Sequence, residues 1–134
     1  MTVWNTRRGR RPAALPTELR LLRASLAVVW LGTAAVSALD GGSRGVAMLA
    51  QAGVNDTTLR ALLLWGGAGL DAVVGVALAV APLRAAATLA FAAAALMTVV
   101  STALIPGAWL DPLGPLLKNL PLLAALLVLR RPVS

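Results

Sequence analysis

The chain has 134 residues, of which 59% are hydrophobic and only 13% are charged. Soluble domains carry roughly 25% charged residues, so this composition excludes a soluble fold, which could not hide so much apolar surface. The formal net charge of +7 does not indicate nucleic-acid binding, because the basic residues stand at the ends of apolar runs.

The sequence contains no Cys, His or Tyr. Haem, iron–sulfur clusters, zinc and dithiol chemistry depend on these side chains. We therefore expect no catalytic activity from the chain alone, and any redox role needs a borrowed cofactor or another chain. At about 20 residues for each crossing, the length allows roughly four membrane spans and no sizeable domain outside the membrane.

Residues 1–19 form a basic segment that lacks the apolar core and the cleavage site of a signal peptide. We interpret this segment as a cytoplasmic tail that adheres to anionic lipid. The membrane domain then covers residues 20–131.

The first apolar run covers residues 21–39, with Thr17 as the expected N-cap and Glu18 in the first turn. It ends at the turn Asp40-Gly41-Gly42. Residues 43–52 form a segment of about ten residues, which is too short to cross a bilayer. We expect an interfacial helix or a re-entrant turn there, on the outer side and closed by Gly53.

Three further apolar runs cover residues 59–81, 85–105 and 115–129. Residues 55–58 read Asn-Asp-Thr-Thr, which supplies caps for the second run, and the third run is rich in alanine. The fourth starts at Pro115, a favoured first-turn position for proline, and is the shortest. The sequence therefore predicts an all-α integral membrane bundle of four transmembrane helices with a short outer interfacial helix.

Basic residues are distributed unequally between the two sides of this arrangement. Nine of them fall on the side of the termini and three on the other side. The positive-inside rule then predicts that both termini are cytoplasmic (N-in, C-in). Trp65 and Trp109 are expected at the outer headgroup level, where indole rings are favoured.

Polar residues gather on single helix faces when each run is projected at 100° per residue. Gly67, Asp71 and Gly75 recur at every fourth position, so the carboxylate lies on a ridge of small residues against which another helix can pack. On the first run, Arg23 and Trp30 share a stripe with small residues, namely Ala27, Ala34 and Ser37.

Asp71 stands near the middle of its span, where an unpaired carboxylate costs at least about 2.5 to 3.5 kcal/mol. We expect it to face the bundle interior and to contact Arg23, Lys118 or Asn119. Two interpretations stay open: an ion-paired strut that fixes helix register, or a group that binds a ligand or a proton. The alternative for Arg23 and Lys118 is that they only extend to the headgroups.

The segment from Trp109 to Leu129, which includes the fourth run, reads WLDPLGPLLKNLPLLAALLVL. It resembles the closing motif W-x-D-P-x-G-P-x-x-K-N-x-P-L of the DoxX-like integral membrane proteins. This resemblance implies a four-helix membrane bundle and a loose link to membrane systems that use quinones. Together with the helix faces, it points to seven candidate ligand-binding residues: Arg23, Trp30, Asp71, Trp109, Asp111, Lys118 and Asn119.

Our leading hypothesis is an accessory subunit of the bacterial inner membrane that holds a quinone-like or lipidic ligand or docks a redox partner. A second hypothesis is a structural subunit of a larger membrane complex without a ligand of its own. A third is a proton-coupled carrier that titrates Asp71, although the runs lack the broken helices typical of transporter sites. Membrane lipids and other membrane subunits are the expected partners, and nucleic acid is not.

Overall fold

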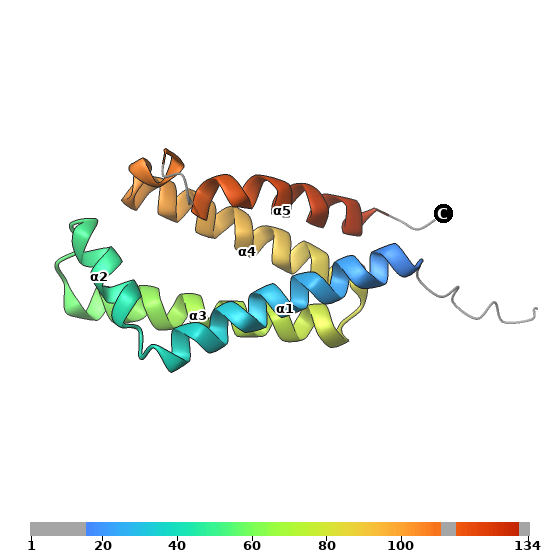
Figure 1. Cartoon of the computed structure of the whole chain (residues 1–134), viewed down its shortest axis with the longest axis horizontal. Coiled ribbons are helices and arrows are strands. Elements are labelled where there is room, and N and C mark those ends of the chain that lie inside the picture. The colour runs from blue at the N-terminus through green and yellow to red at the C-terminus, as the bar shows by residue number, and fades with distance from the viewer. Residues whose placement is uncertain (1–15, 111–114, 132–134) are drawn as a thin grey trace, which may run out of the picture.

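The computed structural model describes residues 16–110 and 115–131. Within these ranges the chain is entirely helical, with five α-helices, one 3₁₀ helix and no strand. The predicted all-α class is therefore confirmed for the part of the chain that is described. The long helices lie roughly along one common axis and alternate in direction from one to the next along the chain (Figure 1).

The first half of the chain contains α1 (Thr17–Leu39), α2 (Ser43–Gln51) and α3 (Thr57–Val80). Gly41 and Gly42, which separate α1 from α2, have φ angles of 58° and 78°, and Gly53 after α2 has a φ of 83°. Glycine adopts these left-handed angles without steric cost, so the predicted turns are confirmed. Asp56 caps α3 by accepting a 2.6 Å hydrogen bond from the backbone N–H of Leu59, as the sequence predicted.

The second half contains α4 (Leu83–Leu104), a 3₁₀ helix η1 (Pro106–Trp109) and α5 (Pro115–Arg130). The start of α4 lies two residues before the predicted one, because the carbonyl of Pro82 already accepts from the N–H of Ala86. The N-cap of α1 was also predicted wrongly: Pro16 occupies it, and its carbonyl accepts from Arg20, so Thr17 is the first helical residue.

Three helices, α1, α3 and α4, are long and apolar enough to cross a membrane. Their outward faces are apolar as well, with Val28 70% and Val99 67% exposed. A helix that is apolar on all sides suits a lipid environment. At 16 residues, α5 is shorter than these three helices.

The long helices form two antiparallel pairs, α1 with α3 and α4 with α5 (Figure 1). The core between them is made of alanine and a few larger apolar side chains, with Trp30, Val74, Leu78 and Leu126 among the buried residues. The pairs draw apart toward the end of the bundle that carries α2 (Figure 1). At the other end lie the start of α1, the turn between α3 and α4, and the end of α5.

Candidate functional site

Helices α1 and α3 approach each other closely at Gly75. A Cβ atom at this position would lie 2.7 Å from Cγ of Leu31 and 3.0 Å from its backbone nitrogen. Only glycine fits so near another helix without displacing it. The expected packing on the small-residue ridge is thus confirmed at Gly75.

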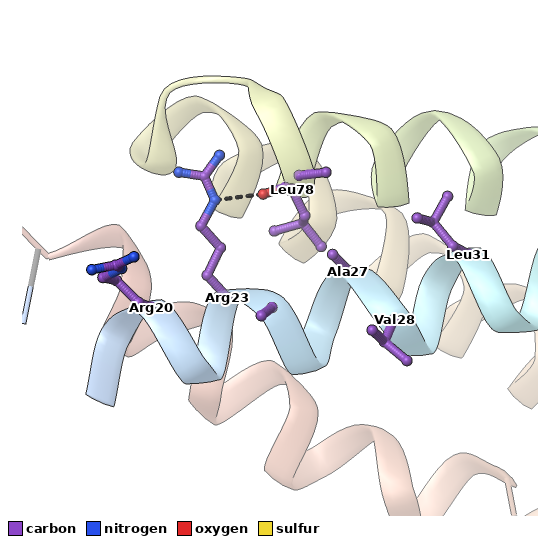
Figure 2. A pocket seen from close by; sticks show the side chains of 8 residues that line it. Arg20, Arg23, Ala27, Val28, Leu31 and Leu78 are labelled. Carbon is purple, nitrogen blue, oxygen red and sulfur yellow. Dashed lines mark hydrogen bonds between the residues drawn. The ribbon is translucent and has the colours of Figure 1, made fainter. Parts of the chain in front are cut away.

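Arg23 of α1 binds the end of α3. Its Nε donates to the carbonyl of Leu78 and its Nη2 to that of Ala81, both at 2.5 Å. Pro82 has no N–H to offer the Leu78 carbonyl four residues earlier, so the guanidinium replaces the missing backbone donor. Figure 2 shows the side chain reaching from α1 to the end of α3. The arginine is therefore committed to helix capping.

A groove of about 640 Å³ runs along this α1–α3 contact and is bordered by Arg20 and Arg23 (Figure 2). The rest of its lining is apolar and includes the exposed residues Val28 and Leu31. Because Arg23 already binds two carbonyls and the lining apart from the two arginines is apolar, the groove offers few free polar groups to a ligand.

A smaller pocket of about 180 Å³ lies between all four long helices. Its polar lining consists of the Asp71 carboxylate from α3, the Asn119 amide from α5, the Trp30 indole and the Thr33 hydroxyl from α1. Ala93 and Ala94 of α4 also line it, and their small side chains leave space between the helices. We call this cavity the central pocket.

A second pocket of about 260 Å³, the outer pocket, extends toward α2. Asp71 and Met97 line both pockets, so these two side chains stand at the junction between them. The outer pocket is otherwise mainly apolar, with Met48 and Leu64 in its wall. The Asp71 carboxylate thus borders two mainly apolar pockets, of which the central one also contains Asn119 and Trp30.

Hydrogen bonds between side chains connect α4 to its neighbours. Asn119 Nδ2 donates to Thr98 Oγ1 at 2.8 Å, and Trp109 Nε1 donates to Thr102 Oγ1 at 3.1 Å. The hydroxyls of Thr98 and Thr102 in turn donate to backbone carbonyls one turn earlier, as expected for threonine in a membrane helix. Asn119 is therefore held at the pocket wall.

The expected contact between Asp71 and a polar partner is not found among the described residues. The only ion pair there joins Arg44 to Asp40 on the surface. Arg23 is occupied by carbonyls, Lys118 is exposed on α5, and Asn119 binds Thr98. Asp71 shares the central pocket with Asn119 and Trp30 without a direct hydrogen bond to either.

The seven candidates are thus dispersed rather than gathered in one site. Asp71, Asn119 and Trp30 meet in the central pocket, whereas Arg23 lies at the end of α3 and Trp109 in η1. Asp111 lies outside the described residues.

The DoxX-like family profile matches residues 27–127. The chain belongs to the DoxX-like family. The match includes the whole central pocket and confirms the family indicated by the motif after Trp109. Neither a curated protein nor a solved structure shows significant similarity to the DoxX-like chain.

Sequence reasoning missed two features of this DoxX-like chain. The only sequence signal for the capping role of Arg23 was Pro82, which has no backbone N–H and so leaves the Leu78 carbonyl without its helical donor. The part of Met97 in dividing the pockets had no signal, because a methionine in an apolar run looks like any other core residue.

Proposed function

We propose that this DoxX-like protein crosses the bacterial inner membrane four times and holds the polar head of an amphipathic molecule, quinone-like or lipidic, in the central pocket. The observation that carries the proposal is the pocket itself. A carboxylate, an amide and an indole converge between four helices that are otherwise lined by alanine and larger apolar side chains. Pockets with mostly apolar walls and a few convergent polar groups are typical of small-molecule sites.

The polar groups of the central pocket suit a head with both donors and acceptors. Asn119 uses one amide N–H for Thr98 and keeps the other, and the Trp30 indole N–H binds no described residue. These two N–H groups match carbonyl oxygens on the ligand. The Asp71 carboxylate can accept a hydrogen bond from a hydroxyl group, so it suits a phenolic or alcoholic group on the ligand.

The apolar outer pocket next to Asp71 gives the tail of such a molecule a place to lie. Its walls include Met97, whose flexible thioether adapts to irregular shapes. Because the sequence lacks redox-active side chains, we propose an accessory role in which the protein holds the molecule or docks a redox partner.

The Asp71→Asn variant tests ligand binding. Replacing the charge by an amide weakens a hydrogen bond from a ligand hydroxyl by about 1.5 kcal/mol, or about tenfold in retention. Mass spectrometry of lipid extracts from the purified protein measures that retention. The matched control is Asp56→Asn, since Asn caps a helix as well as Asp does and Asp56 lies outside both pockets.

The central pocket would be refuted as a ligand site if Asp71→Asn and Asp71→Leu both retained as much small molecule in their lipid extracts as the wild type and kept its thermal stability. A ligand lost equally from the Asp56→Asn control would refute it too.

The four-span topology needs α5 to cross the membrane. Its 16 residues extend about 24 Å at 1.5 Å per residue, somewhat less than a hydrocarbon core of about 30 Å. Single cysteines are readily introduced because the sequence has none. The thiols of the single variants Arg44→Cys and Asp56→Cys should react with an impermeant reagent from outside. The thiol of Arg131→Cys should react only after the membrane is opened. Labelling of Arg131 from outside would contradict the proposed topology.

The alternative is a structural subunit of a larger membrane complex. The exposed apolar faces of α1 and α4 favour it, because they offer surfaces for other membrane helices as well as for lipid. A copurification gel run beside the lipid extract separates the two roles. Stoichiometric protein partners with no retained small molecule would favour the structural subunit.

A further inference from the structure

We propose a second site, separate from the central pocket, that binds the phosphate of an anionic phospholipid at the basic end of the α4–α5 pair. A cavity of about 470 Å³ opens there, lined by Arg84, Thr88, Leu127, Arg130 and Arg131. Arg84 comes from the first turn of α4 and the other two arginines from the end of α5. We call it the arginine pocket.

The three guanidinium groups have no competing partner among the described residues. No hydrogen bond or ion pair engages them there, and no acidic side chain lines the pocket. The hydroxyl of Thr88 donates to the carbonyl of Arg84, so the arginines supply the donors of the pocket. Each guanidinium presents five N–H groups in a planar fork that matches phosphate oxygens.

Phe91 holds one of these guanidiniums in place. The Cζ atom of Arg130 lies 5.1 Å from the centre of the Phe91 ring, within the range of a cation–π contact. The ring has no oxygen or nitrogen acceptor, so Arg130 keeps its capacity to bind phosphate while its side chain loses freedom. This restriction lowers the entropy cost of binding an anion.

Helix stability does not explain Arg84. It lies in the first turn of α4, where the helix dipole is positive and a cation is disfavoured. Arg130 and Arg131, in contrast, stand at the end of α5, where the dipole favours them. An anion bound between the three arginines gives Arg84 a favourable partner.

The pocket also distinguishes a lipid from a free anion. Leu127 lines the pocket one turn inward from Arg130, and Phe91, which contacts Arg130, lies outside the lining two turns inward from Arg84. Arginines followed inward by apolar side chains match a phosphate headgroup followed by acyl chains. We therefore assign the phosphate to a membrane phospholipid.

Native mass spectrometry of the full chain in detergent tests this site, with phosphatidylglycerol and phosphatidylcholine as probes. The wild type should retain phosphatidylglycerol preferentially. Each arginine near a headgroup contributes about fivefold, so Arg84→Gln, Arg130→Gln and Arg131→Gln combined should reduce this preference by about a hundredfold. Phe91→Leu, which keeps every charge, should weaken retention by a few fold.

The matched control is Arg44→Gln, since Arg44 is exposed on α2 at the opposite end of the bundle. It should leave the preference unchanged, and melting followed by circular dichroism should show that all variants stay folded. Equal loss in Arg44→Gln, or undiminished preference in the triple variant, would overturn the site. Displacement of the lipid by millimolar inorganic phosphate would overturn the lipid assignment. It would also be overturned if the wild type copurified with an acidic protein instead of lipid and the triple variant lost that protein.

Discussion

The two helix pairs of this bundle are held together by different means. In the α1–α3 pair, Gly75 brings the two backbones into contact and Arg23 caps the end of α3. In the α4–α5 pair, a face of small alanines packs on Leu126 and Leu129, and one hydrogen bond joins Asn119 to Thr98. The first pair is locked by backbone proximity and the second by side-chain contacts.

This difference explains where the cavities lie. The close approach at Gly75 leaves only a surface groove along α1 and α3, whereas the central and outer pockets form between the two pairs. Alanine is too small to fill the gap that α4 leaves toward α1 and α3. Asp71 and Met97 lie at this boundary, because each of them lines both pockets.

The largest effect is expected at the glycine contact. Gly75→Val places side-chain atoms inside the space of Leu31, and such overpacking costs typically about 1 to 3 kcal/mol of unfolding free energy. Thermal unfolding in mixed micelles measures the loss. In the control Gly69→Val the new Cβ meets nothing within 4 Å, so its stability should match the wild type. Equal losses in both variants would show that glycine serves flexibility and not proximity.

An effect of similar size is expected at the cap of α3. Arg23→Met leaves the Leu78 carbonyl without a donor, and an unsatisfied buried acceptor costs about 1 to 3 kcal/mol. Arg20→Met is the control, because Arg20 lies one turn earlier on α1, is exposed and hydrogen-bonds to no described residue through its side chain. If both variants melted alike, Arg23 would act only through its charge.

The polar link of the second pair should contribute less. Side-chain hydrogen bonds between membrane helices average about 0.6 kcal/mol in double-mutant cycles. A cycle of Asn119→Leu and Thr98→Val should return a coupling energy of that size. Thr88→Val serves as the control, since Thr88 binds only the carbonyl of Arg84 in its own helix and should not couple to Asn119. A coupling energy of zero at Thr98 would remove this link from the comparison.

The smallest effect is expected at the exposed turn before α2. The backbone N–H of Arg44 donates a 2.9 Å hydrogen bond to the Asp40 carboxylate. This bond is the largest cause that holds the pKa of Asp40 below its ordinary value of 3.8, and the Ser43 side chain and the charge of Arg44 add to it. A lowered folded pKa stabilises the fold above pH 3.8, and this contribution disappears as the pH falls through the folded value. Hydrogen exchange at the Arg44 amide should show this loss of protection.

Asp40→Asn should abolish that pH dependence and leave global unfolding unchanged, because the group is exposed. Persistence of the same pH dependence in this variant would assign it to another group.

Much of the helix pattern could be predicted from local signals. The caps at Asp56, the left-handed glycines after α1 and α2, and the alanine-rich α4 all depend on residues close in sequence. The observed starts of α1 and α4 differ from the predicted ones by a few residues, because the carbonyls of Pro16 and Pro82 accept the first helical hydrogen bonds. A backbone carbonyl leaves no side-chain signal in the sequence. The same locality explains why threonine hydroxyls bind carbonyls of their own helix, as Thr98 and Thr102 do.

The candidate site was predictable only in part. Helical periodicity placed Asp71 on an inward face and Trp30 on one stripe of its helix with Arg23, and both Asp71 and Trp30 line the central pocket. Periodicity could not identify the partners of these residues, because the position of a residue along its helix axis does not give the rotation or tilt of that helix. Arg23 lies closer to the open carbonyls of α3 than to Asp71, and the charge pairing expected from vertical distances does not form among the described residues.

The sequence by itself determined the helices, the turns between them, the family and the inward face of α3, because propensity, capping and periodicity act over a few residues. Only the tertiary structure decided which groups meet: Arg23 with the end of α3, Asn119 with Thr98, and three arginines from α4 and α5 around one cavity. The physical reason is that these contacts join residues between 21 and 58 positions apart in the chain, and their formation depends on how whole helices pack.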